Sequence, residues 1–178
     1  MNRTKLLMLS LMTAAIINSN SLQAQVLKGT NYVNLGVGAG TFGFSGTGGV
    51  PIVASVEHGF TDKISAGVYG GLIKRKFGTD LAYAYLLFGV KGAYHFNEAL
   101  NISNPKIDTY GGAALFYRSY KLKYKDNEDP AFNMKSTGGN LGIGFFAGGK
   151  YLFSKNIGAF AEVGYGISPL QLGLTVKF

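Results

Sequence analysis

The sequence predicts an all-β fold: a closed, antiparallel, eight-stranded transmembrane β-barrel preceded by a cleavable signal peptide. Three observations predict it. In eight separate segments, apolar residues alternate with small or polar ones, which indicates strands with two different faces. Glycine and aromatic residues are abundant, with 27 Gly, 11 Tyr and 13 Phe in 178 residues, and glycine disfavours helix. After the N-terminal segment, no uncharged apolar stretch is long enough for a spanning helix.

The N-terminal segment, residues 1–24, has the parts of a secretory signal peptide. Arg3 and Lys5 form a basic start, residues 6–17 an apolar core, and a polar stretch leads to Ala24. A transmembrane helix needs about 20 apolar residues, so this core is short for a span. We expect cleavage after Ala24, with a retained helical anchor as the alternative, and a barrel domain over residues 25–178. The chain contains no Cys, so disulfides cannot stabilise it.

Four strands are expected in the first half of the barrel domain. The first reads YVNLGVGAG, where Val, Leu, Val and Ala alternate with Asn and Gly. The fourth is apolar on both faces, and Lys91 decides between them: it places Phe88 and Val90 on the apolar face and itself on the other. The four segments are residues 32–40, 50–58, 63–72 and 81–96.

Four further strands are expected at residues 108–124, 140–153, 158–167 and 170–178. The connections alternate in length. GFTD (59–62) and SKN (154–156) are short, whereas residues 41–49 and 124–137 form long loops. Short periplasmic turns opposite longer outer loops are typical of outer-membrane barrels. Two connections fit this pattern less well, because residues 97–106 are long for a turn and the last loop, near Ser168, is short.

Isolated charges fall on the small, Gly-rich face of these strands, which we expect to line the lumen. A Lys or Arg facing lipid at mid-membrane would cost about 2–4 kcal/mol, whereas an ion-paired, hydrogen-bonded network inside the barrel is tolerated. For Glu57 and Lys177, close to strand ends, solvation at the periplasmic rim is an alternative. The predicted lumen network comprises Glu57, Lys91, Asp108, Arg118, Lys150, Glu162 and Lys177.

Aromatic residues gather at the expected strand ends, as the two interfaces of a membrane favour. The periplasmic group is Phe60, Tyr94, Phe96, Tyr151, Phe153 and Phe178, and the outer group is Phe42, Phe44, Phe77 and Tyr117.

Four features carry a resemblance to a known family: the signal peptide, the eight alternating strands, AYHF (93–96) before a turn, and the terminal LQLGLTVKF. The chain resembles the small eight-stranded outer-membrane barrels of the OmpA/OmpX-like type, in particular those of Bacteroidetes-like bacteria. The resemblance implies the bacterial outer membrane, a monomer, and a structural, adhesive or surface-interaction role without enzymatic activity. It also implies that Phe178 is an assembly signal read by the barrel assembly machinery.

The search for reactive groups predicts no catalytic residue, cofactor or metal site. His58 and His95 are the only histidines; they fall near periplasmic strand ends, and we assign both to interface or turn hydrogen bonding. Without Cys, a zinc site is not expected. Although the net charge is +8, an exported protein does not meet nucleic acid.

Basic residues cluster at the expected outer end, where lipid phosphates lie. Charge-assisted hydrogen bonds to phosphate are strong, so these residues are candidate contacts to lipopolysaccharide. A solvated loop whose charge is balanced by DNED (126–129) explains them equally well. The candidates are Lys74, Arg75, Lys76, Lys121 and Lys123.

Three other functions remain open at this point. Inward glycines could leave a narrow water-filled channel for small solutes. A polar cluster at the outer rim could serve a lipid A-modifying enzyme. A soluble ligand-binding barrel would require the apolar face to point inward.

Overall fold

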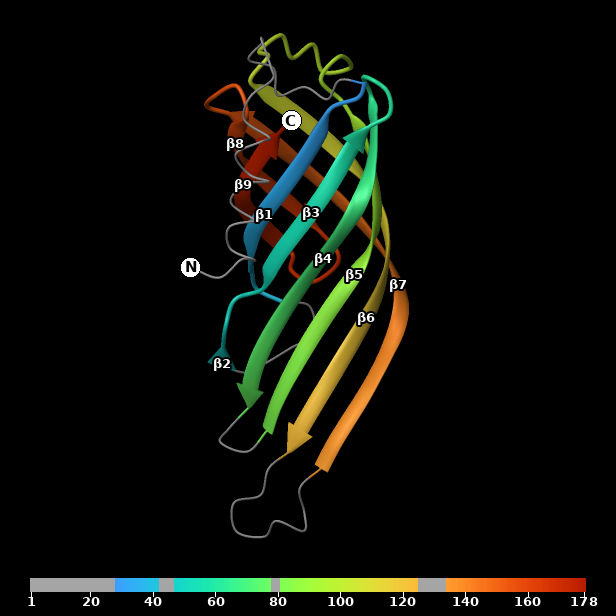
Figure 1. Ribbon diagram of the computed structural model, residues 1–178, viewed down its shortest axis with the longest axis vertical. Helices are drawn as coiled ribbons and strands as arrows, with labels where there is room; N and C mark the ends of the chain where they lie inside the picture. The colour runs from blue at the N-terminus through green and yellow to red at the C-terminus, as the bar shows by residue number, and fades with distance from the viewer. Residues whose placement is uncertain (1–27, 42–46, 78–80, 125–133) are drawn as a thin grey trace, which may run out of the picture.

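The computed structural model describes residues 28–41, 47–77, 81–124 and 134–178, and in these ranges eight antiparallel strands close into a ring (Figure 1). The predicted signal peptide lies outside the described residues and stays a prediction. A ninth element, β2 (Thr47–Gly48), pairs only with β4. The ring consists of β1 (Asn31–Ala39), β3 (Ile52–Gly59), β4 (Ile64–Phe77), β5 (Leu81–His95), β6 (Ile107–Tyr124), β7 (Met134–Leu152), β8 (Ile157–Gly164) and β9 (Leu170–Lys177).

Two pairings close the ring. β4 pairs with β5 along the full length of β4, and the first strand, β1, pairs with the last, β9, from Tyr32↔Lys177 to Ala39↔Leu170. The seam continues at the chain end, where Phe178 N donates to Asn31 O (3.0 Å) and Asn31 N donates to Phe178 O (2.8 Å). Within lipid every backbone polar group needs a partner inside the protein, and closure supplies it.

The two faces of the strands meet different environments. Outward side chains are apolar and exposed, such as Leu35 (60% exposed) and Ile143 (63%), whereas the inward Lys150 is only 2% exposed. This arrangement confirms the predicted faces and contradicts the soluble barrel, in which the apolar face would point inward. No helix in the described ranges is long and apolar enough to cross a membrane.

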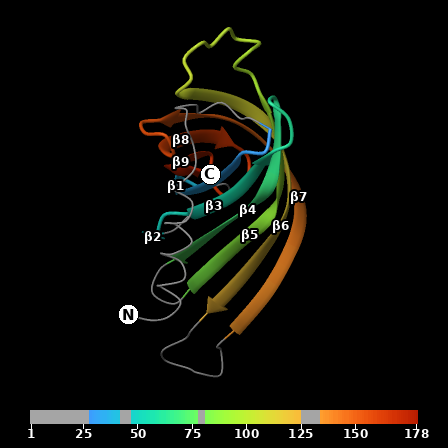
Figure 2. The same cartoon turned by 45° about the horizontal axis from the view of Figure 1, so that its top comes forward.

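The strands differ greatly in length. β1, β3, β8 and β9 have 8 or 9 residues, whereas β4 to β7 have 14, 15, 18 and 19. Because a transmembrane strand needs about 9–11 residues, the four long strands continue beyond the ring as a sheet (Figures 1 and 2). We call this end of the molecule the loop end.

Two predicted boundaries at the loop end are wrong. β4 continues to Phe77, beyond the predicted strand end at residue 72. Residues 134–137, assigned from sequence to a loop, belong to β7, which pairs with β6 as far as Met134↔Tyr124. Their two faces are similarly polar, so no alternation marks them as a strand.

The opposite end, which we call the turn end, carries the connections between β3 and β4, β5 and β6, and β7 and β8. The long β5–β6 connection is held by Asn97, whose Nδ2 donates to Ile107 O and whose Oδ1 accepts from Thr109 N, both at 2.6 Å. All six aromatic residues predicted for this end have exposed side chains. Of the outer group, Tyr117 is exposed, while Phe42, Phe44 and the Phe77 side chain lie outside what the structure describes.

Candidate functional site

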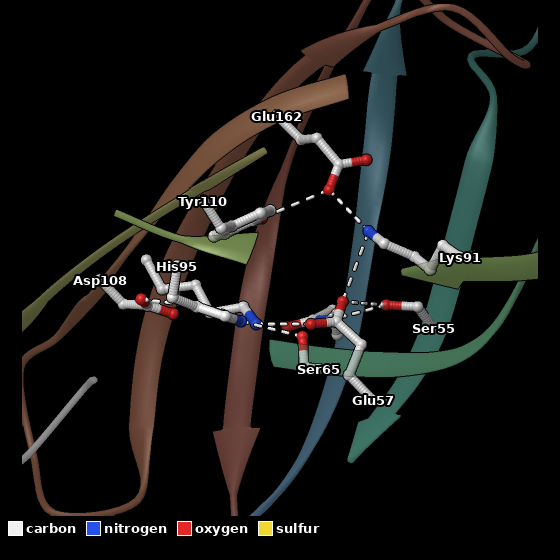
Figure 3. A network of polar contacts seen from close by, with 10 residues as sticks. Ser55, Glu57, Ser65, Lys91, His95, Asp108, Tyr110 and Glu162 are labelled. Carbon is white, nitrogen blue, oxygen red and sulfur yellow. Dashed lines mark hydrogen bonds and ion pairs between the residues drawn. The ribbon is translucent and has the colours of Figure 1, made fainter. Parts of the chain in front are cut away.

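The lumen holds an ion-pair network contributed by four strands (Figure 3). Lys150 Nζ on β7 lies 2.7 Å from Glu57 Oε2 on β3. Lys91 Nζ on β5 lies 2.7 Å from Glu162 Oε2 on β8 and 3.4 Å from Glu57 Oε1. Two ammonium groups and two carboxylates therefore form one balanced cluster, and all four residues are at least 93% buried.

Neutral groups complete the hydrogen bonding of this cluster. Asn34 Nδ2 donates to Glu57 Oε1 at 2.8 Å, and Ser55 Oγ donates to the same oxygen at 3.1 Å. Tyr110 OH donates to Glu162 Oε2 at 3.3 Å. A buried ion pair persists only when its remaining lone pairs and protons have hydrogen-bond partners. These three side chains supply such partners to the two carboxylates.

Aromatic rings cover the two ammonium groups. Lys150 Nζ lies 4.3 Å from the centroid of Tyr32, and Lys91 Nζ lies 4.2 Å from that of Phe146. A cation over an aromatic face is attracted by its quadrupole, most strongly where water is excluded. The rings therefore provide cation–π contacts for both ammonium groups of the cluster.

A second polar cluster, nearer the turn end, joins Ser65, His95 and Asp108 (Figure 3). Ser65 Oγ lies 2.8 Å from His95 Nε2, and His95 Nδ1 lies 2.8 Å from Asp108 Oδ1. This is the connectivity of a hydrolytic triad. Ser65, His95 and Asp108 are, however, 1%, 4% and 0% exposed, so a substrate has no access to the serine.

The assignment of His95 to an interface or turn is therefore wrong. Tyr94 and Phe96 face outward, so by alternation His95 must point into the lumen, a signal that was present in the sequence. His58 does lie at the turn end, where its Nδ1 is 2.8 Å from Asn31 Oδ1 and its ring packs edge-on against Phe60.

An apolar layer packs beside the ion pairs and fills more of the lumen. It consists of Val53, Leu87, Phe116, Phe160 and Ile167. Inward glycines make room for its rings: a Cβ added to Gly142 would lie 2.5 Å from Phe116 Cε2, and one on Gly36 would lie 2.9 Å from Phe160 Cζ. Beside Asn34, Tyr69 and Glu162, a cavity of about 10 Å³ remains, about the space of one water molecule.

The other predicted lumen residues lie outside the four-charge cluster. Arg118, at the loop-end mouth, donates from Nη2 to Gly166 O (3.4 Å) and stacks over Phe116, 5.3 Å from the ring centroid. Lys177 is 5% exposed near the turn end, and its backbone N donates to Asn156 O. Solvation at the rim is therefore wrong for Lys177 and for Glu57, which is 2% exposed.

The basic residues of the loop end divide between the two faces of the sheet. Lys74, Lys76 and Lys121 are exposed on the outward face that also carries Leu72 and Tyr117. Arg75 lies between two outward residues and faces the other way. The Lys123 side chain lies outside what the structure describes, although its backbone pairs with Ala82.

Among the described residues, no group of three His, Cys, Asp or Glu side chains is placed to hold a metal ion. The polar residues that sequence reasoning missed are Asn34, Ser55, Ser65, His95 and Tyr110. Each lies opposite an apolar face, so the alternation that located the charges locates them too.

The fold matches small outer-membrane barrels of known structure. The N-terminal barrel domain of Pseudomonas aeruginosa OprF is similar with TM-score 0.57 and 16% identity, over 85% of this chain and 98% of that one. Ail, the attachment invasion locus protein of Yersinia pestis, is similar with TM-score 0.53 and 14% identity, over 85% and 100%. Neisserial surface protein A gives TM-score 0.55 and 15% identity, over 84% and 96%.

No protein-family model matches the sequence, and no curated protein sequence matches it either. The similar structures are small eight-stranded outer-membrane barrels, and the described residues of this chain form the same closed ring with the exposed apolar belt that a bilayer requires. The chain therefore has the fold of the small eight-stranded outer-membrane β-barrels, and its exposed apolar belt fits the bacterial outer membrane in which those barrels lie.

Proposed function

We propose that the protein is a non-conducting, non-enzymatic barrel that presents a β-sheet at the outer surface for contact with other molecules. The observation that carries this proposal is the extension of β4 to β7 beyond the ring. β7 pairs with β8 only from Phe146 onward, so residues 134–144 have β6 on one side and no strand partner among the described residues on the other.

The side of β7 that faces β8 is free of described strand partners over residues 134–144, and the direction of its backbone groups there can be derived. Tyr165 N donates to Phe145 O at 2.9 Å, so the N–H and C=O of residue 145 point toward this side. In an antiparallel strand this direction alternates, and Thr137 and Gly139 therefore point the same way. Both lie beyond the last outward apolar residue, Leu141. An open edge of this kind takes an added strand from a partner.

The filled lumen argues against the channel alternative. Aromatic rings fill the space beside the inward glycines, where a water path could have been left. Two ion pairs, Lys91–Glu162 and Lys150–Glu57, cross the lumen next to them. An eight-stranded barrel has an interior just wide enough for side chains. Steady ion currents in planar bilayers would contradict this part of the proposal.

An enzymatic role has little support from the described residues. The one triad-like arrangement is buried, and it lies toward the turn end rather than at the outer rim. Identical lipid A mass spectra from cells with and without the protein are expected, and a mass change that depends on the protein would contradict a non-enzymatic role.

Thr137→Pro tests the sheet edge. Proline removes the N–H of Thr137 on the free side but leaves the β6–β7 ladder intact, and Thr137→Val is the matched control. In a strain lacking the protein, wild type and T137V should restore cell aggregation and attachment to protein-coated surfaces, whereas T137P should not. Equal restoration by all three, or no effect of the deletion in either assay, counts against the proposal.

A further inference from the structure

The outward face of the long sheet changes from apolar to basic side chains at the loop end. On β4 the apolar series ends at Leu72 and is followed at the next outward positions by Lys74 and Lys76. On β6, Leu115 and Tyr117 give way, after Ser119, to Lys121. The change marks the upper limit of the apolar belt, which is the level of lipid headgroups.

Strand register places these lysines around a hollow. Lys74 pairs with Ala84, and Ala84 pairs with Lys121, so the three lie in one row across β4, β5 and β6. The next row toward the loop end is Lys76, Ala82 and Lys123. Neighbouring strands are about 4.8 Å apart, so each pair of lysine backbones is separated by about 9.6 Å, with only a methyl group between them.

The space over the two alanines is a pocket of about 490 Å³, lined by Lys74, Lys76, Ala82, Ala84, Lys121 and Gly49 among others. Its floor is small and half-buried and its walls are exposed lysines. Among the described residues, Lys74, Lys76 and Lys121 have no ion-pair partner.

We propose that this pocket, which we call the lysine pocket, binds a phosphate group of an outer-leaflet glycolipid of the lipid A class, held between Lys74 and Lys121. Charge-assisted hydrogen bonds from two ammonium groups can reach one phosphate across Ala84. The apolar belt directly below accepts the acyl chains of the same molecule. A free anion would gain the first contact but not the second.

The proposal rests on the membrane position of the belt and not on the free edge of β7. T137P should therefore leave lipid binding unchanged, which separates failure of this inference from failure of the proposed surface role.

The test uses the full barrel in phosphatidylcholine nanodiscs, titrated with diphosphorylated lipid A, dephosphorylated lipid A, or inorganic phosphate. Wild type should bind the diphosphorylated form most tightly, and K74Q/K121Q should weaken that binding about thirtyfold, because each lysine near an anionic lipid contributes about fivefold. The control K106Q/K155Q removes two lysines at the turn end and should bind as wild type does. A heat-dependent gel shift verifies that each variant is folded.

Three results would overturn the inference: equal loss of binding in K106Q/K155Q, no loss in K74Q/K121Q, or inorganic phosphate displacing the lipid at equal concentration. Asp126, Glu128 and Asp129 lie outside the described residues. If they occupied the lysines, K74Q/K121Q would have no effect and D126N/E128Q/D129N would increase binding, which also rejects the lysine pocket as a lipid site in the native chain.

Discussion

Lys150 and Glu57 meet at 2.7 Å inside the barrel although 93 positions separate them in the chain. Neither is more than 2% exposed, and Glu57 is also 3.4 Å from Lys91. Glu57 is thus the carboxylate shared by both lysines of the four-charge cluster. It links β3 to β5, two strands away, and to β7 on the opposite side of the ring.

Replacing Glu57 by Met should destabilise the barrel severely. The change leaves Lys150 buried without its carboxylate, and an uncompensated buried charge costs about 3–5 kcal/mol. The double variant E57M/K150M removes both charges and should lose clearly less than the sum of the two single variants. Urea unfolding of the barrel in lipid vesicles measures all four corners of this cycle, and strict additivity would show that the pair does not couple.

Phe116 and Gly142 form a complementary pair in the apolar layer of the lumen. Phe116→Ala should cost about 3–5 kcal/mol through the cavity it leaves. Gly142→Leu alone should cost about 1–3 kcal/mol by overpacking against the ring. Combined, the leucine occupies the space that the ring vacated, so F116A/G142L should be more stable than F116A. A double variant less stable than F116A would contradict the packing described here.

The strands of the ring could be predicted from the sequence because their two faces lie in different environments. Lipid outside and a packed lumen inside impose alternation on every strand, and Lys91 was enough to orient even the strand that is apolar on both faces. Above the belt that contrast disappears. Residues 134–139 read MKSTGG, polar on both faces, and their strand state follows from pairing with β6 rather than from their own pattern.

The lumen contacts were only partly accessible to the same reasoning. Alternation shows that Glu57 and Lys150 point inward, but their meeting depends on the register of the four strand pairings that separate β3 from β7 around the ring and on the tilt of the strands. His95 was misplaced for a different reason. Its position near a turn was given more weight than the outward direction of Tyr94 and Phe96 on either side.

The apolar belt should reject charge in a position-dependent way. Val90 lies on the outward face of β5 with 55% of its side chain exposed. Val90→Arg should reduce the free energy of unfolding in vesicles by about 2–4 kcal/mol. Thr137→Arg, outward on β7 but beyond the belt, should change it by less than about 0.5 kcal/mol. Similar losses for the two variants would mean that the belt does not face lipid.

The exposed pair Lys63–Glu98 at the turn end offers a pH measurement outside the membrane. Their charged groups lie 2.8 Å apart, and the hydrogen bond that Lys63 donates to Glu98 raises the pKa of Lys63 above its ordinary value of 10.5. A raised pKa means that the small stabilisation is complete below 10.5 and is lost as the pH rises through the pKa of the folded state. Glu98→Gln should lower the pKa of Lys63 in an NMR titration, with no change at neutral pH in the urea midpoint beyond that of an exposed pair. An unchanged pKa in E98Q would show that the pair does not persist in solution.

The two roles of Phe178, in the seam and as an assembly signal, can be tested separately. Its backbone N and O both bond to Asn31, so deleting it removes two seam hydrogen bonds along with the ring. Phe178→Ala keeps those bonds and removes only a side chain that is 43% exposed. If the aromatic ring of Phe178 is read by the barrel assembly machinery, F178A should lower the amount of heat-modifiable barrel in cell envelopes severalfold, while the urea midpoint of the protein refolded into vesicles should barely change.

Phe153→Ala is the control: it removes a comparably exposed aromatic ring at the same end and should leave envelope levels unaltered. Equal envelope levels for F178A and F153A would remove the assembly role and leave Phe178 as one of six aromatic residues at the interface.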